Sequence, residues 1–295
     1  EIITTTHDHY ASDQTLHNKA ETSGAILRKI SLYDIPASIT VNSIVKKILS
    51  AISPKTRVLA LTWVHSCTGV KLPLKEIAQN IQDINLNRRT EDKIIICVDA
   101  VHAFGVEYIE NVASLGCDFI ISGCHKWLFG PRGTGIVWGS KLGWSRISPI
   151  IVSFDIEAFL PWRKKEYENC KPPAARLCSP GGFTAYEHRW ALAEAFNWHI
   201  EIGPEKISDR IVELNNICKA QLSNLQEIKL HTPIDPEFSA GLICFDVANL
   251  DPTDVVERLL RNDVITGQTP YRNSSLRVAL GILNSEAEIN RLVKE

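Results

Sequence analysis

The sequence of 295 residues contains no methionine, not even at its start, and it opens on Glu1-Ile2-Ile3, a pattern typical of the middle of a strand. We therefore expect that an N-terminal segment is missing from the sequence and that methionines have been dropped from inside it. Some of the spacings discussed below would then be short by one residue.

The sequence also lacks an excess of either charge, since 32 lysines and arginines stand against 34 aspartates and glutamates. This balance argues against nucleic acid or an anionic membrane surface as a partner. No uncharged apolar run approaches membrane-spanning length, and the start shows no signal-peptide pattern. We therefore expect neither a nucleic-acid partner nor a membrane partner.

Paired CxxC motifs are absent as well, and several of the cysteines lie inside apolar runs. The eight cysteines are scattered over the chain, at Cys67, Cys97, Cys117, Cys124, Cys170, Cys178, Cys218 and Cys244. This pattern gives only weak support to a zinc site or a disulfide framework. Reduced, buried cysteines in a cytoplasmic enzyme are the simpler interpretation, and we expect no metal.

The first half of the chain alternates apolar runs with longer amphipathic stretches. Expected strands are Glu1–Thr5, Ala25–Leu32, Arg57–Trp63, Lys93–Val98, Asp118–Ile121 and Gly135–Trp138. Expected helices are Asp13–Thr22, Val41–Ala51 and Leu74–Ile84. This alternation predicts an α/β fold, with a mainly parallel sheet covered by helices and ligands bound at the carboxyl ends of the strands.

A helix is predicted over Thr184–Ile202 and ends at Gly203, and the pattern of helices and strands changes after it. Beyond it we expect a helix, two strands, a helix, a strand and a terminal helix, the first five over Lys206–Leu222, Lys229–Thr232, Gly241–Val247, Pro252–Arg261 and Leu276–Leu280. We interpret residues 1–203 as a large domain and residues 204–295 as a smaller α+β domain.

Lys126 lies just beyond an apolar run, Phe119–Ile121, that reads as a buried strand in the stretch CDFIISGCHKWLFGPRGTGIV. Polar groups just beyond strand ends often face a site. Burial would favour the neutral amine of such a lysine, which can then attack a carbonyl. The alternative is an ordinary lysine whose stem packs on apolar surface while its head reaches water.

Two more charged residues stand in apolar surroundings. Asp99 ends the run Ile94–Val98, an expensive place for an unpaired carboxylate unless it caps a turn or a helix. Arg277 lies within the apolar strand Leu276–Leu280 and needs a partner there. Arg272 is the nearby competitor, and we expect it to face solvent.

The order D-F-x-x-x-G-x-H-K, followed by G-x-G and an apolar strand, resembles the cofactor-lysine signature of class V aminotransferases. These are pyridoxal-phosphate enzymes of fold type I, whose large domain has a seven-stranded type of sheet. The resemblance covers nearly the whole chain and is strongest from Arg57 to Gly139. It implies that Lys126 bonds covalently to the cofactor, that Asp99 pairs with the protonated pyridine nitrogen, and that His102 lies beside the cofactor.

The resemblance carries further residues over to the cofactor. It implies that His9, in the turn Asp8-His9-Tyr10-Ala11, stacks on the cofactor ring, although the same residues also fit a plain helix start capped by Ser12 or Asp13. It places Ser66, with Thr68 beside it, near the phenolic oxygen of the cofactor. It makes His125 a ligand of the phosphate, but Gly123 stands where the family has a hydroxyl, and Cys124 is a second departure.

The resemblance also implies a homodimer with shared active sites and an amino-acid substrate. Gly181 lies in the segment that would reach the cofactor phosphate of the partner subunit, although the family's threonine is missing there. Arg277 and Asn284 would clamp the substrate carboxylate. One of the family's phosphate-binding loops would lie in the missing N-terminal segment.

Two segments of the sequence are most similar to the isopenicillin N epimerase-like branch of the family, namely HKWLFGPRGTGIVWG and GGFTAYEHRWALAEAF. This branch also includes carbon–sulfur lyases. Desulfurases need a cysteine shortly before the carboxylate-binding arginine, and Val264–Ser275 has none. Epimerisation needs a second acid/base, for which His9 and Tyr10 are the candidates. Transamination and a non-catalytic role for the fold both stay open.

A mass spectrum of the natural protein tests the expectation of missing residues. We expect a mass above that summed from the 295 residues, because the N-terminal segment and the methionines add to it. A mass that agrees with the sequence as it stands would contradict this.

Overall fold

The computed structural model describes residues 1–151, 153–166, 174–179 and 185–295. Its larger sheet has the strand order β2-β1-β3-β4-β5-β6, in which β6 alone runs antiparallel to its neighbour. The strands are β1 (Ile2–Thr5), β2 (Leu27–Ile30), β3 (Val58–Thr62), β4 (Ile95–Asp99), β5 (Phe119–Gly123) and β6 (Gly135–Gly139). The predicted α/β fold is confirmed, and the sheet has six strands in the described residues where the resemblance implied a seven-stranded type.

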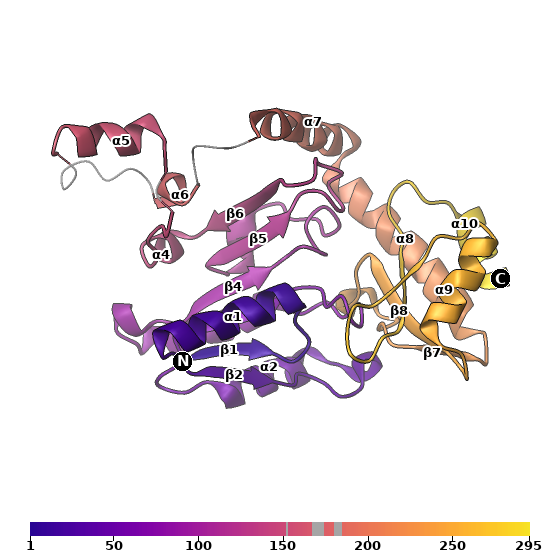
Figure 1. Cartoon of the computed structure of the whole chain (residues 1–295). Coiled ribbons are helices and arrows are strands. Elements are labelled where there is room, and N and C mark those ends of the chain that lie inside the picture. Colours follow the sequence, from indigo (N-terminus) through magenta and orange to yellow (C-terminus); the bar gives the residue numbers. More distant parts are fainter. Residues whose placement is uncertain (152, 167–173, 180–184) are drawn as a thin grey trace.

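Helices cover both faces of this sheet (Figure 1). They are α1 (Tyr10–Ser23), α2 (Val41–Ala51) and α3 (Leu74–Leu86), and α7 (Tyr186–Ile202) leads out of this part of the chain. Since side chains alternate along a strand, one face is apolar and packs on α2 and α3 through Ile3, Leu59, Leu61, Ile96, Val98 and Ile120. The other face carries Thr62 and Asp99 and lies against α1.

Helix α1 begins earlier than expected, and the predicted cap was wrong. His9 is the N-cap residue, and its Nδ1 accepts a hydrogen bond of 3.2 Å from the backbone N–H of Ala11. Ser12 and Asp13 lie inside the first turn instead. An imidazole nitrogen therefore takes the place of the usual hydroxyl or carboxylate oxygen, which leaves the Ser12 hydroxyl free for another partner.

A second, antiparallel sheet has the order β7-β8-β10-β9. Its strands are β7 (Ile228–Leu230), β8 (Leu242–Val247), β9 (Gly267–Gln268) and β10 (Leu276–Ala279). The helices α8 (Pro204–Ser223), α9 (Pro252–Arg261) and α10 (Glu286–Lys294) pack on it around their own apolar core. The division at residue 203 stays a prediction, because Ile207 and Ile211 of α8 join the core of the larger sheet.

Several short elements had no signal in the sequence. They are α4 (Lys141–Trp144), α5 (Ile156–Arg163), α6 (Ala174–Leu177) and the 3-10 turns Pro36–Ser38, Thr90–Asp92, Val112–Leu115 and Pro236–Phe238. Helix α5 contains Pro161, a residue that normally ends a helix. Helices α5 and α6 form an arm that projects from the body (Figure 1), where Arg176 pairs with Asp155 and Glu157.

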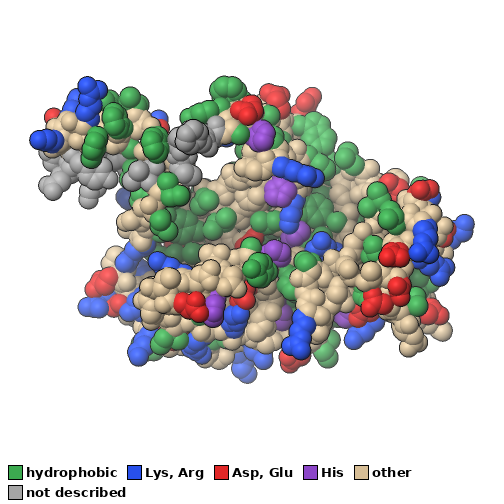
Figure 2. All heavy atoms as spheres, in the orientation of Figure 1, with side chains coloured by type: hydrophobic (Ala, Val, Ile, Leu, Met, Phe, Trp, Pro, Cys, Tyr) green, Lys and Arg blue, Asp and Glu red, His purple; other side chains and the backbone are tan. Residues whose placement is uncertain are grey.

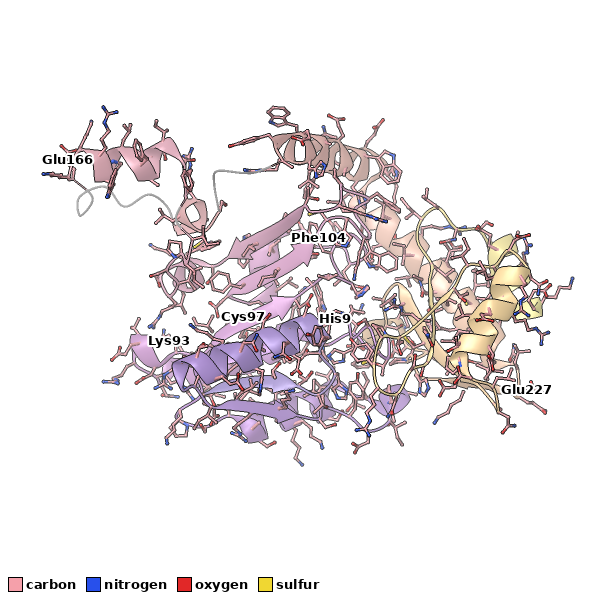
Figure 3. All side chains as sticks on the ribbon, viewed as in Figure 1. His9, Lys93, Cys97, Phe104, Glu166 and Glu227 are labelled. Atoms are coloured by element: carbon pink, nitrogen blue, oxygen red, sulfur yellow. The ribbon has the colours of Figure 1, made fainter. Side chains whose placement is uncertain are left out.

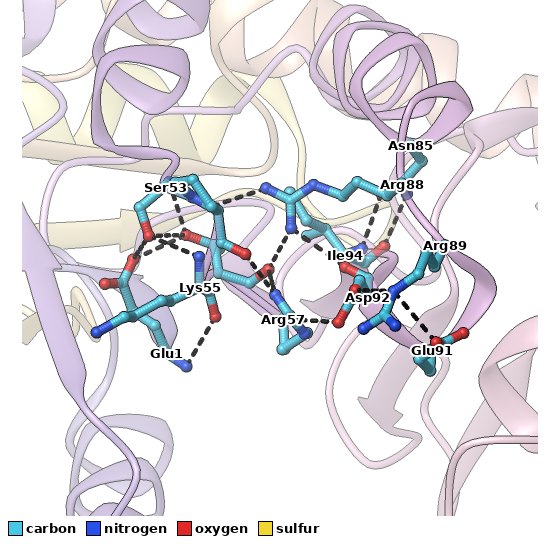
Figure 4. A network of polar contacts seen from close by, with 12 residues as sticks. Glu1, Ser53, Lys55, Arg57, Asn85, Arg88, Arg89, Glu91, Asp92 and Ile94 are labelled. Atoms are coloured by element: carbon cyan, nitrogen blue, oxygen red, sulfur yellow. Dashed lines mark hydrogen bonds and ion pairs between the residues drawn. The ribbon is translucent and has the colours of Figure 1, made fainter.

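The edge of the larger sheet at the amino ends of its strands is closed by a polar network (Figure 4). The Glu1 carboxylate accepts hydrogen bonds from Arg28 at 3.1 Å and from Thr56 at 2.7 Å. Arg57 pairs with Asp92, and Arg88 donates to the backbone carbonyls of this edge. The charged groups here have partners within the network, which leaves the opposite, carboxyl-end edge as the place for a site.

A second polar feature of the fold is the buried lysine of α8. Lys219 is 1% exposed, and its Nζ donates to the carbonyls of Pro233 and Ile234 at 3.1 and 2.8 Å and to Ser239 Oγ at 2.6 Å. Burial lowers the pKa of this amine to about 8. In the described residues, seven cysteines are free, and every helix is too short or too polar to cross a bilayer.

Lys219 predicts a rise in stability with pH. Between pH 8 and 10.5 the folded protein has released a proton that the unfolded chain keeps, so raising the pH favours the folded state. The gain is about 3 kcal/mol. We expect chemical denaturation to show it in the wild type and in the exposed control Lys47→Met, and not in Lys219→Met. Curves of the same slope for all three proteins would contradict the prediction.

Candidate active site

The carboxyl ends of β1, β3, β4 and β5 lie on one edge of the sheet, because these strands are parallel. The loops that follow them carry six of the predicted residues, which are His9 after β1, Ser66 and Thr68 after β3, His102 after β4, and His125 and Lys126 after β5. Figure 3 labels His9 at the end of α1 that faces the smaller sheet. Figure 2 shows histidine and basic side chains gathered near the middle of this face of the molecule.

Lys126 and His102 are in direct contact, with 3.1 Å between the lysine Nζ and the histidine Nε2. The lysine side chain reaches solvent, yet its pKa is lowered, first by burial of the amine and then by the positive charge of Arg277. The negative charge of Asp99 acts in the opposite direction. The surroundings therefore favour a neutral amine more than those of an ordinary surface lysine do.

His102 is held in its neutral form. Its pKa is lowered to about 3, first by burial and then by the positive charges of Lys126 and Arg277. A neutral ring has one donor and one acceptor nitrogen, and the Nε2 atom is the one engaged by Lys126. The Nδ1 atom is buried and has no partner in the described part of the chain. Such an orphaned polar atom at a strand end is a sign of a group that binds there.

The carboxylate of Asp99 serves two partners from different elements. One oxygen accepts from the backbone N–H of Val101 at 3.0 Å, which is the turn-capping role that the sequence left open. The other accepts from the hydroxyl of Ser12 in α1 at 3.1 Å. Ser12 thereby holds the carboxylate at the edge of a cavity of about 300 Å³ between α1 and the sheet.

The guanidinium of Arg277 has no ion pair or hydrogen bond with any described residue, although the residue is half-buried in β10. It lines a cavity of about 400 Å³ together with Lys126 and His102, and the remaining wall is mostly apolar. Asn284 lines the same cavity, and its Oδ1 accepts from the backbone N–H of Gly281 at 2.9 Å. Arg272 is exposed, as expected. Arg277 is therefore the cation that an incoming anion would meet beside the lysine.

Ser66 and Thr68 lie in the loop after β3 but have different surroundings. The hydroxyl of Ser66 is 2.6 Å from the hydroxyl of Tyr271, a residue of the smaller sheet's region. The hydroxyl of Thr68 is 2.8 Å from that of the buried Tyr33, which also contacts His65 Nδ1 at 2.7 Å. Ser66 thus belongs to the seam between the two sheets, and Thr68 belongs to a buried cluster beneath it.

His125 is exposed and folds back over Gly123. A Cβ atom at position 123 would lie 2.9 Å from the Cε1 atom of the His125 ring. A hydroxyl-bearing residue at 123 therefore requires a different orientation of the ring, so the glycine and this ring position belong together. Gly181 lies outside the described residues.

The sheet is of fold type I, a lysine amine and an aspartate lie at its carboxyl edge, and an arginine without a side-chain partner in the described residues lines the cavity of the lysine. This combination defines the class of pyridoxal-phosphate enzymes. The chain belongs to the aminotransferase class-V family, whose model matches residues 1–292. The family expected from the sequence is thereby confirmed, and so are its enzyme class and its cofactor.

Two relatives show how the chain compares in sequence. It is 27% identical to the isopenicillin N epimerase of Streptomyces clavuligerus over 289 residues, which cover 92% of this chain and 67% of the relative. It is 29% identical to a probable cysteine desulfurase of Haemophilus influenzae over 277 residues, which cover 90% of this chain and 55% of the relative. The chain therefore spans between about half and two thirds of the length of these relatives.

Solved structures share the fold. The cystine C-S lyase C-DES, in complex with its reaction product cysteine persulfide, superimposes with a TM-score of 0.82 at 20% identity, over 99% of this chain and 74% of that one. The cysteine desulfurase from Thermococcus onnurineus NA1 gives 0.78 at 20% identity, over 100% of this chain and 71% of that one.

The residues present fit pyridoxal phosphate at its aldehyde and ring ends. The amine of Lys126 suits the aldehyde, the carboxylate of Asp99 suits the ring nitrogen, and the orphaned Nδ1 of His102 is a polar atom left for the group that binds beside the lysine. For the phosphate, His125 is the described residue that the resemblance provides, and it is exposed.

Two site residues were missed from the sequence. Ser12 was read as a cap, and nothing in its neighbourhood pointed to Asp99, which lies 87 residues away. Tyr271 entered the sequence analysis only as a member of the stretch Val264–Ser275, which was noted for its lack of cysteine. Its partner Ser66 lies 205 residues away. Contacts of such separation leave no local pattern, so composition and spacing could not have revealed them.

The neutral state of His102 predicts a loss of stability in acid. As the pH falls from 6.5 towards 3, the unfolded chain takes up a proton at this histidine that the folded protein does not, so the folded state becomes less favoured. His102→Gln removes this contribution, and its stability should fall less steeply than that of the wild type over this range. The exposed control His17→Gln should follow the wild type. Equal slopes for wild type and His102→Gln in denaturant titrations would rule the assignment out.

Proposed function

We propose that this protein acts at the α-carbon of an amino acid with pyridoxal phosphate as cofactor, and that it changes the configuration at that carbon. The observation that carries the proposal is the contact between Lys126 and His102 beside the unpaired Arg277, around one cavity. The likeness to isopenicillin N epimerase over 92% of the chain supports this choice of reaction.

The residues of the chain divide the work between binding and proton transfer. The guanidinium of Arg277 binds the substrate carboxylate as a bidentate pair, with Asn284 beside it. This places the α-hydrogen within reach of the Lys126 amine, which removes or returns a proton. His102 stays neutral and holds the amine through its Nε2 atom. When bound, the cofactor supplies the electron sink for the α-carbon, which Asp99 sustains at the ring nitrogen.

A carbon–sulfur lyase is the second candidate. Relatives named as cysteine desulfurases support it, at 29% identity for the Haemophilus protein. Against desulfuration stands the stretch Val264–Ser275, which contains no cysteine. A transaminase of the same family is a third reading, and a fold that binds without catalysis is a fourth.

We also propose a cytoplasmic homodimer with active sites shared between subunits. The family resemblance implies the dimer, and the surface of the arm suits an apolar contact. Phe154, Ile156 and Trp162 are 71%, 63% and 67% exposed, and apolar side chains stand out on the arm in Figure 2. Large apolar patches on soluble proteins commonly mark sites of association. The described cysteines are free, as a reducing compartment requires.

Absorbance and isotope exchange test the reaction. We expect the purified protein to bind pyridoxal phosphate with a visible absorption band that Lys126→Ala abolishes, because the covalent link to the amine is lost. The exposed control Lys47→Ala should retain the band. A band of equal strength in Lys126→Ala would contradict the covalent role assigned to this lysine. A protein that binds no cofactor would contradict the proposed function.

Incubation with a panel of L-amino acids in deuterated water separates the candidate reactions. Deuterium at the α-carbon with inversion and no net product supports the epimerase. A keto acid with the pyridoxamine form of the cofactor indicates a transaminase, and pyruvate with a thiol product indicates a lyase. Either of these last two outcomes would contradict the proposed inversion.

A further inference from the structure

Tyr271 lies in a loop that its neighbours hold in one shape. The loop joins β9 to β10 and is closed around Thr269, which is 1% exposed. The backbone N–H of Thr269 donates to the carbonyl of Ser275 at 2.8 Å, and the backbone N–H of Ser275 donates to Thr269 Oγ1 at 3.0 Å. Ser274 Oγ donates to the carbonyl of Thr269 at 2.7 Å. The loop therefore presents Tyr271 from a fixed base.

From this base the phenol reaches across to the larger sheet. Its hydroxyl is 2.6 Å from the hydroxyl of Ser66, and its ring stands edge-on to the ring of His9 at 6.4 Å and 86°. Ser66 follows β3 and His9 follows β1, and these two strands are neighbours in the sheet. Tyr271 thus stands over the ends of β1 and β3.

The lysine stands further along the same edge. His102 follows β4 and Lys126 follows β5, the next two strands in the order. Neighbouring strands are about 5 Å apart, and β5 lies two strands from β3 and three from β1, so the strand ends beneath the phenol and the amine are roughly 10 to 15 Å apart. Arg277 is close to both groups, since its positive charge adds to the effect of burial in lowering the pKa of Lys126 and partly opposes the rise that burial causes in the pKa of Tyr271. A carboxylate bound at Arg277 would therefore have the amine on one side and the phenol on the other.

The two groups suit opposite halves of a proton exchange. Burial raises the pKa of Tyr271 to about 12, so the phenol holds its proton near neutral pH and is a donor. Burial lowers the pKa of Lys126, which makes the amine a better acceptor. The two residues considered from the sequence are less suitable: Tyr10 is 71% exposed, and one ring nitrogen of His9 is engaged by the backbone of Ala11.

We propose that Tyr271 is the second proton carrier of this site, held by Ser66 on the side of the bound amino acid opposite Lys126. This inference rests on the proposed function. The Lys126 amine takes the α-hydrogen of one enantiomer as a proton, and the electron pair of the broken C–H bond stays with the α-carbon. The Tyr271 hydroxyl then gives its proton to the opposite side of that carbon, where the same pair forms the new C–H bond. The ammonium releases a proton to solvent and the phenolate takes one up, so no oxidant or reductant is needed.

Tyr271→Phe tests the assignment, with Tyr108→Phe as a matched control at an exposed tyrosine. In deuterated water we expect interconversion of the enantiomers to fall by at least ~100-fold in Tyr271→Phe. Exchange of the α-hydrogen with retained configuration, which Lys126 carries out from its own side, should stay within ~10-fold of wild type. Tyr108→Phe should behave as wild type in both respects. Unchanged interconversion, or equal loss of exchange and interconversion, would overturn the proposal.

A second measurement does not depend on turnover. Nitration of tyrosines in the protein with cofactor, mapped on peptides, should be slowed at Tyr271 by a saturating amino acid and unchanged at Tyr108. Nitration of Tyr271 at the same rate with and without the amino acid would also overturn the proposal. A wild type that exchanges no α-hydrogen with any amino acid would refute the proposed function itself, whereas exchange that ignores Tyr271 would refute this inference alone.

Discussion

The site depends on a surplus of positive charge that the described part of the chain does not neutralise. Arg277 has no carboxylate partner there, and its charge lowers the pKa of both Lys126 and His102. Bringing such groups together is costly unless an anion completes the set. The cavity they surround is therefore suited to a substrate carboxylate, and burial together with the charge of Arg277 explains how the lysine becomes easier to deprotonate.

This arrangement requires two sheets of different construction. The parallel sheet brings Asp99, His102 and Lys126 together because its strands end at the same edge. The antiparallel sheet contributes Arg277 from β10 and Tyr271 from the adjoining loop. Buried groups that take no part in the reaction connect the two sheets. Lys219 of α8 donates hydrogen bonds to the turn that includes Ser239, and this turn contacts Val70 and Lys71 of the larger sheet's region.

Most elements of the fold could be predicted, since strongly periodic segments are specified locally. Helix α2 was placed to the residue, and α9 likewise, because apolar spacing marks the helical stretch and a capping residue, Thr40 or Asp251, stands at its start. The start of α1 was wrong, because a histidine took the capping position that Ser12 was expected to hold. The helix α5 was missed because Pro161 lies within it.

The order of residues along the chain was enough to indicate the α/β fold, the family and three charged residues next to apolar runs. Lys126 lies just beyond such a run, Asp99 ends one and Arg277 lies within one. The partners of those groups could not be read in the same way. Ser12 on Asp99 and Tyr271 on Ser66 meet across 87 and 205 residues, and such pairs exist only once strand order and the packing of the two sheets bring them together. A contact between residues far apart in the chain, unlike the periodicity of a helix or strand, produces no pattern in the neighbouring residues of the sequence.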